Sequence, residues 1–170
     1  MKTLVISGGS SGIGKATASL FAERGWRVFE LSRHGGEEAK VERFEAKDAG
    51  EIIHVFCDVC SEESCHAAIE EVWRQTDHVD VVISNAGYGI SGPIEFTDIP
   101  AAEHQMDVNF MGAVRFTQAV LPQLRQQRRG RIIYTSSVAA ILAVPYQAFY
   151  SASKAAINAF ALALANEVRE

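Results

Sequence analysis

Short apolar runs alternate with amphipathic segments along the chain, and this alternation predicts strands separated by helices. The runs with the length and apolar content of buried strands are residues 3–7, 27–32, 52–57, 79–84 and 131–136. Strands that alternate with helices form parallel sheets with right-handed crossovers. We therefore expect one α/β domain over residues 1–170, with a doubly wound, five-stranded parallel sheet in a three-layer α/β/α arrangement.

Apolar residues three and four positions apart predict helices at residues 13–25, Glu62–Gln75, 101–127 and 146–170. Pro122 is expected either to kink the third of these or to mark a distorted turn. The last helix is rich in alanine and apolar nearly all round, which is typical of a helix that is covered on several sides. Residues 35–50 are highly charged, so any helix there is expected to be exposed.

The composition is that of an ordinary globular domain, with 48% hydrophobic and 22% charged residues. A net charge of −5 gives no general attraction to nucleic acid or to an anionic membrane surface. The apolar runs are shorter than the roughly 20 residues that span a membrane, and no signal-peptide core follows the N-terminus. We therefore expect a cytoplasmic chain with neither a nucleic-acid nor a membrane partner.

Three cysteines lie close together and raise the question of a metal site or a redox centre. Cys57 and Cys60 form a C-x-x-C pair, and His66 follows Cys65. The alternative is that Cys57 ends a buried strand and Cys65 joins the apolar stripe of the next helix, both as small hydrophobes. Because no second pair of ligands follows at metal spacing and the histidines are scattered, we expect no metal site.

A glycine-rich turn, Gly8-x-x-x-Gly12-x-Gly14, joins the first strand to the first helix. Glycines permit a tight turn and the close approach of a pyrophosphate, which then meets the N–H groups at the helix N-terminus. The alternative is a plain turn, because the spacing differs from G-x-G-x-x-G. The strand–turn–helix context favours a dinucleotide site.

The end of the second strand bears on the choice of cofactor. An acid at this place suits the ribose 2′-hydroxyl of NAD, whereas an arginine suits the 2′-phosphate of NADP. Ser32 stands where the acid would be expected and Arg33 follows it, while Glu30 lies two residues too early. This favours NADP(H) over NAD(H); the alternative is that Arg33 is a solvated surface residue.

Tyr150 and Lys154 are four residues apart and therefore share one face of the last helix. A free phenol titrates near pH 10 and is a poor acid at neutral pH, but a nearby ammonium stabilises the phenolate form. That tuning suits general acid–base catalysis. Ser137, after the fifth strand, can donate a hydrogen bond to a substrate oxygen as charge develops on it.

Several motifs stand in a fixed order along the chain: the glycine turn, Asp58, Asn85-Ala86-Gly87, Asn109, Ser137 and Tyr150-x-x-x-Lys154. Together they resemble the motif set of the short-chain dehydrogenase/reductase family, and the resemblance covers essentially the whole chain. It implies a Rossmann-like fold and an NADP(H)-dependent oxidoreductase that interconverts a carbonyl and a secondary alcohol. Residues 85–93 are similar to the branch that contains hydroxysteroid dehydrogenases.

The resemblance also implies roles for individual residues. Tyr150 would donate the proton, Lys154 would tune Tyr150 and hold the nicotinamide ribose, Ser137 would orient the carbonyl, and Asn109 would anchor a water that links Lys154 to solvent. Asp58 would contact the adenine. The residues implied in cofactor binding are Gly8, Ser10, Ser11, Gly12, Ile13, Gly14, Arg33, Asp58, Val59, Asn85, Ala86, Gly87, Tyr150 and Lys154.

Two departures from the family pattern are visible in the turn. Ser7 replaces the usual threonine but keeps a hydroxyl, so we expect little effect. Ser11 lacks the basic side chain that many NADP-dependent members carry here, so Arg33 alone supports the cofactor preference.

Members of this family continue past this length with further strands and a substrate-closing loop. The resemblance therefore implies that the chain is C-terminally truncated. The alternative function is a truncated, non-catalytic nucleotide-binding or interaction module. The apolar last helix and the open edge of the fifth strand predict a homo-oligomer formed through the last two long helices.

Overall fold

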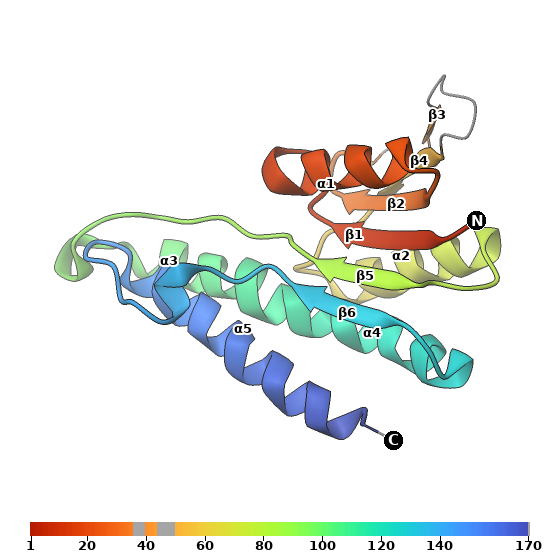
Figure 1. Ribbon diagram of the computed structural model, residues 1–170. Coiled ribbons are helices and arrows are strands. Elements are labelled where there is room, and N and C mark those ends of the chain that lie inside the picture. The colour runs from red at the N-terminus through yellow and green to blue at the C-terminus, as the bar shows by residue number, and fades with distance from the viewer. Residues whose placement is uncertain (36–39, 44–49, 170) are drawn as a thin grey trace.

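The computed structural model describes residues 1–35, 40–43 and 50–169 (Figure 1). These residues form a six-stranded sheet in the order β3-β4-β2-β1-β5-β6. The strands are β1 (Thr3–Ser7), β2 (Arg27–Ser32), β3 (Lys40–Arg43), β4 (Glu51–Phe56), β5 (Val81–Ser84) and β6 (Arg131–Tyr134). The α-helices are α1 (Gly12–Glu23), α2 (Glu62–Gln75), α3 (Ile99–Met106), α4 (Gly112–Gln127) and α5 (Ala148–Glu167). The prediction of a doubly wound α/β fold is confirmed.

The structure contains a sixth strand, β3, in addition to the five that the sequence predicted. β3 pairs antiparallel with β4, whereas the other neighbouring strands pair in parallel. The sequence did not predict β3 because the segment is charged. An edge strand with exposed Val41 and Glu42 needs no apolar run. Residues 36–39 and 44–49, the remainder of the segment where an exposed helix was expected, lie outside the described residues.

Different helices cover the two faces of the sheet (Figure 1). Leu4, Ile6 and Val28 belong to the apolar cluster that α1 joins through Ala18 and Ala22. Val5 and Phe29 belong to a second cluster that α2 and α4 complete. Neighbouring residues of a strand point to opposite faces, so the apolar residues of β1 and β2 supply both clusters.

The predicted helical region 101–127 is a continuous helical stretch with an irregular centre. α3 leads into a π-helix, Asp107–Met111, and α4 follows directly. Pro122 lies inside α4, which continues to Gln127. The π-helix was not predicted, and it contains the buried Asn109.

α5 lies beyond α4 in Figure 1, and its Phe160 ring meets Phe110 and Tyr134 edge-on. Its length and composition are those of a helix able to cross a membrane, a test that the core helix of a domain also passes, and the expectation of no membrane partner stays a prediction. Buried Lys154 and Ile157 lie on the side that packs against the domain, whereas Leu162 is 70% exposed. α5 is therefore covered along one face only.

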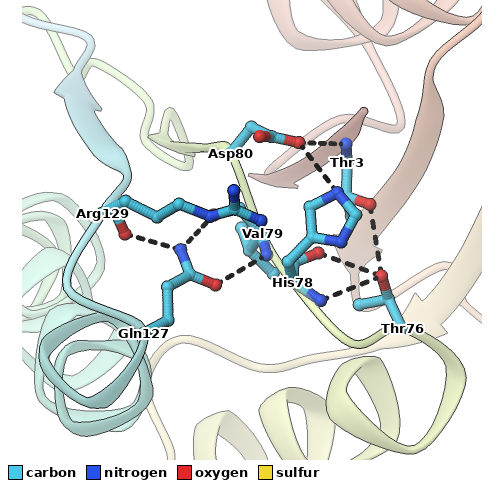
Figure 2. A network of polar contacts seen from close by, with 7 residues as sticks. All are labelled: Thr3, Thr76, His78, Val79, Asp80, Gln127 and Arg129. Atoms are coloured by element: carbon cyan, nitrogen blue, oxygen red, sulfur yellow. Dashed lines mark hydrogen bonds and ion pairs between the residues drawn. The ribbon is translucent and has the colours of Figure 1, made fainter. Parts of the chain in front are cut away.

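A network of polar contacts lies at the N-terminal ends of β1 and β5 (Figure 2). The Thr3 N–H donates to Asp80 Oδ2 at 2.8 Å, and His78 Nε2 lies 3.4 Å from the same oxygen. Gln127, at the end of α4, accepts from the Val79 N–H at 3.1 Å and donates to the Val79 carbonyl at 2.6 Å. The candidate site lies at the other ends of the strands, their carboxyl ends.

Candidate active site

A cleft of about 740 Å³ opens along the carboxyl ends of the strands. In open parallel sheets this edge is where ligands bind. All the residues predicted from the sequence for the site line the cleft, except Gly14, Asn109 and Ser137. The cleft therefore joins residues that lie more than 140 positions apart, from Gly8 to Lys154.

The glycine turn is packed tightly on its inner side and open on its outer side. Gly8 has φ +68°, and a Cβ there would lie 2.7 Å from the Ala86 Cα. A Cβ on Gly14 would lie 2.2 Å from the Gly8 carbonyl oxygen. Gly12 has φ +53° and no described atom within 4 Å of its Cβ position. The turn thus presents bare backbone to the cleft, as a pyrophosphate would require.

The N-terminus of α1 is not neutralised by its own side chains. Ser11 is the N-cap residue, but its hydroxyl accepts no capping hydrogen bond from the described residues. The first turn also carries no acid. The free N–H groups and the positive end of the helix dipole therefore favour an anion in the cleft.

Hydroxyl and amide side chains tie the strand ends together. Ser7 Oγ accepts from the N–H groups of Asn85 at 3.1 Å and Ala86 at 3.3 Å. Asn85 Nδ2 donates to the Gly8 carbonyl at 3.0 Å, and its Oδ1 accepts from Thr135 Oγ1 at 3.1 Å. The hydroxyl that Ser7 shares with the usual threonine therefore accepts hydrogen bonds from the loop after β5. Thr135 was missed by sequence reasoning, because the predicted strand 131–136 contained it, whereas β6 ends at Tyr134.

Arg33 is exposed at the end of β2 and lines the cleft, as predicted. Its neighbour His34 also lines the cleft, with Nδ1 3.4 Å from Ser10 Oγ of the glycine turn. Glu30 is buried in β2, where its carboxylate lies 2.9 Å from His54 Nδ1. Glu30, the acid of β2, is therefore paired with His54 and does not serve the cleft. The charged side chain at the end of β2 is the guanidinium of Arg33.

Tyr150 and Lys154, both from α5, line the same cleft as the glycine turn. Lys154 is 4% exposed, its Nζ donates to the Thr135 carbonyl at 2.8 Å, and it lies 5.8 Å from the centroid of the Tyr150 ring. Burial lowers the pKa of Lys154 below its usual 10.5. A Cβ on Gly89 would lie 3.4 Å from the Tyr150 ring, so the ring rests on this backbone.

Asn109 connects the loop after β5 to α5. Its Oδ1 accepts from the Tyr88 N–H at 2.9 Å, and its Nδ2 donates to the Tyr88 carbonyl at 2.8 Å and to Ser153 Oγ at 3.1 Å. Ser153 in turn donates to the Tyr150 carbonyl at 2.8 Å. Gln105, one helical turn before Asn109, also donates to the Tyr88 carbonyl at 3.1 Å. Sequence reasoning missed Gln105, for which the four-residue spacing was the available signal.

Ser137 is not brought into the cleft. Its hydroxyl accepts from the Ala139 N–H at 3.1 Å and caps a short 3₁₀ helix, Val138–Ala140. The side chain is half-buried in this position. Its O–H remains able to donate, because a hydroxyl can accept and donate together.

The three cysteines divide into a pair and a single residue. A hydrogen bond with Cys65 and burial raise the pKa of Cys57, while the same bond lowers that of Cys65. Partial burial and a hydrogen bond to Asp107 raise the pKa of Cys60 to about 12. The residues of the C-x-x-C motif therefore have different partners, as expected if Cys57 and Cys65 are packed hydrophobes.

Comparison with known sequences places these features in context. The sequence model of the family described as short chain dehydrogenase matches residues 2–170. The chain is 39% identical over 165 residues to the 3-ketodihydrosphingosine reductase of Bacteroides thetaiotaomicron, covering 97% of this chain and 58% of that protein. It is 36% identical over 168 residues to the retinol dehydrogenase 8 of Bos taurus, covering 96% and 53%. The chain spans about half the length of the curated relatives it matches.

Solved structures show the same architecture. An alcohol dehydrogenase from the archaeon Thermococcus sibiricus, complexed with 5-hydroxy-NADP, superposes with a TM-score of 0.87 at 27% identity, over 98% of this chain and 71% of that one. An NAD⁺-bound xylitol dehydrogenase gives a TM-score of 0.86 at 28% identity, over 98% and 65%. Both nicotinamide dinucleotides therefore occur among the structural neighbours.

Proposed function

The chain belongs to the short chain dehydrogenase family, and we propose that it acts as an NADP(H)-dependent oxidoreductase that interconverts a carbonyl and a secondary alcohol. The observation that carries this proposal is the arrangement of the cleft. Its lining includes both a bare glycine turn at a helix N-terminus and the pair Tyr150 and Lys154.

The residues present fit a nicotinamide dinucleotide. The turn leaves no room for a Cβ at Gly8 or Gly14 and presents open backbone at Gly12, so a pyrophosphate could approach the N–H groups of α1. Asp58 and the backbone at Gly87 line the middle of the cleft. When bound, the dinucleotide would supply or accept the hydride.

The preference for NADP(H) rests on the charge at the end of β2. Arg33 is exposed on the cleft, and the acid nearest to it along β2, Glu30, is buried beside His54. A guanidinium suits a 2′-phosphate, whereas a ribose 2′-hydroxyl would call for a carboxylate at this place.

Tyr150 is proposed to give its phenolic proton to the carbonyl oxygen of the substrate during reduction. The buried ammonium of Lys154 would stabilise the phenolate that remains. Asn109 holds the Tyr88 loop against α5 and so keeps Tyr150 and Lys154 at the wall of the cleft. The role of Asn109 in a water link to Lys154 stays a prediction.

The test compares two tyrosine variants in reduction of a carbonyl panel with NADPH. Tyr150→Phe should lower turnover by about 10²–10⁴-fold, because general acid catalysis typically contributes that much, and it should leave NADPH affinity nearly unchanged. Tyr146→Phe is the matched control, since Tyr146 is 66% exposed on the preceding loop. Near-normal turnover by Tyr150→Phe would show that another group donates the proton.

The position of Ser137 favours a second candidate, a non-catalytic nucleotide-binding module. Its hydroxyl accepts from the Ala139 N–H at the start of a 3₁₀ helix, and Ser137 is not among the residues that line the cleft. Binding of NADPH without turnover of any carbonyl in the panel would support this alternative. Turnover that Ser137→Ala abolishes would exclude it.

A homo-oligomer is the proposed assembly, formed through the outer faces of α4 and α5. The exposed Leu162 and the small alanines beside it give α5 an apolar outer face that suits close helix packing. Leu162→Lys should then shift the species seen by light scattering toward the monomer. A parent chain that is monomeric at micromolar concentration would rule out the assembly. Cytoplasmic localisation stays a proposal, which cell fractionation would test.

A further inference from the structure

A cluster of three different metal-ligand types lies beside the cleft, which one of the three residues, His104, lines. Cys60 belongs to the loop after β4, His104 to α3, and Asp107 is the first residue of the π-helix. The ligand atoms of these three side chains all lie within 4.8 Å of one another. Cys60 and Asp107 are half-buried, while His104 is exposed and lines the cleft. The cluster joins segments that are more than 40 positions apart.

The chemistry of the three ligands matches zinc. Zn²⁺ is bound in proteins by thiolate sulfur, imidazole nitrogen and carboxylate oxygen, and sites with three protein ligands keep a fourth position open. Bond lengths of about 2.0–2.3 Å place tetrahedral ligand atoms about 3.5 Å apart. The cluster therefore needs only a small contraction. His104 can supply it, because its ring has no hydrogen-bond partner among the described residues and lies 6.1 Å from the Tyr88 ring.

The surroundings hold two of the ligands in place. Arg115 Nη2 lies 2.7 Å from Asp107 Oδ1, and its Nη1 donates to the Val59 carbonyl at 3.2 Å, next to Cys60. The same guanidinium thus orients the carboxylate and the loop that carries the thiol. Asp107 Oδ2 is left for a metal, and a carboxylate that is oriented by a second group is a common feature of metal sites.

Close packing brings the loop and the helix together without room for another side chain. A Cβ on Gly112, just after the π-helix, would lie 2.8 Å from Val59 Cγ2. The Cys60 N–H is held by Asp58 Oδ1 at 3.0 Å, and the Cys60 thiol is hydrogen-bonded to Asp107. A cation would take the place of that thiol proton between the sulfur and the carboxylate.

We propose that Cys60, His104 and Asp107 bind one zinc ion beside the cleft. Binding releases the Cys60 thiol proton to solvent, and the complex of Zn²⁺ with one thiolate, one carboxylate and one neutral imidazole carries no net charge. The ion links the loop after β4 to α3 and the π-helix. Cys57 and Cys65 take no part, because they are hydrogen-bonded to each other.

The experiment titrates the chelator-treated chain with Co²⁺, which reports a tetrahedral site by its visible bands and a bound thiolate by a near-ultraviolet charge-transfer band. The expected result is a 1:1 complex with both signals, which one equivalent of Zn²⁺ displaces. Cys60→Ser should remove the charge-transfer band. His104→Gln should weaken Zn²⁺ affinity by at least about tenfold.

His66→Gln is the matched control, because His66 is an exposed histidine of α2 whose Nε2 lies 4.0 Å from Glu62. It should bind Zn²⁺ as the parent does, and circular dichroism should show all variants folded. A charge-transfer band that persists in Cys60→Ser would assign the metal to the other cysteines and overturn the proposal. So would the absence of the band in the parent, or Zn²⁺ affinity that His104→Gln leaves unchanged. None of these outcomes depends on dehydrogenase activity.

Discussion

Asn109→Ala tests how much the contact between the Tyr88 loop and α5 stabilises the domain. Asn109 is fully buried and makes three hydrogen bonds, two with the Tyr88 backbone and one with Ser153. A typical intramolecular hydrogen bond contributes about 1 kcal/mol net, so the three contribute about 3 kcal/mol. The Tyr88 carbonyl keeps Gln105 as a donor, whereas the Tyr88 N–H loses its acceptor.

For a chain of this length, about 3 kcal/mol corresponds to a fall of roughly 6–12 °C in the melting temperature. Urea unfolding followed by circular dichroism measures the free energy directly. Asn166→Ala is the matched control, because Asn166 is exposed in the last turn of α5. An Asn109→Ala variant that unfolds within about 0.5 kcal/mol of Asn166→Ala would refute the reasoning, since substitutions at ordinary surface sites stay within that range.

Three further predictions concern the turn, the buried lysine and the cofactor. Gly14→Ala should destabilise the chain far more than Gly12→Ala in thermal melts, because its Cβ would meet the backbone at 2.2 Å, whereas Gly12→Ala meets only the cost of φ +53°, about 1–2 kcal/mol. Lys154→Met should be at least as stable as the parent at pH 7, since it removes a buried charge. Because burial lowers the pKa of Lys154 below 10.5, the unfolded chain holds a proton there that the folded chain releases. Unfolding at pH 7 and pH 10 should therefore show the parent gaining stability relative to Lys154→Met as the pH rises; a difference that does not change with pH would contradict the burial. Arg33→Ala should erase a ten- to hundredfold preference for NADPH over NADH in titration calorimetry, because a charge-assisted bond contributes about 1.5–3 kcal/mol, while Arg24→Ala, at the exposed end of α1, should not.

The sequence determined the buried strands and the edge of the sheet on which the site lies. β1 and β2 have the predicted bounds, because each is a mostly apolar run bounded by turn residues, although β2 also contains the buried Glu30. Residues that directly follow such strands meet at one edge, which is why Gly8, Asn85 and Arg33 line one cleft as expected. These features follow from local pattern and from the handedness of the crossovers.

Some elements could not be predicted, because the pattern that signals them is weak or shared with another structure. β3 is a charged edge strand, and it is recognised as a strand by its pairing with β4 and not by its sequence. The π-helix inserts one extra residue into a turn of an otherwise regular helix, and residue propensities do not signal such an insertion.

Only the tertiary structure decided which polar groups meet. The contact of Asn109 and Gln105 with Tyr88, the capping position of Ser137, and the cluster of Cys60 with His104 and Asp107 each depend on how distant loops pack. A side-chain hydrogen bond acts over about 3 Å, so a displacement of one loop by a few ångströms would exchange its partners. No local spacing of residues carries that information, because it is set by the packing of the whole domain.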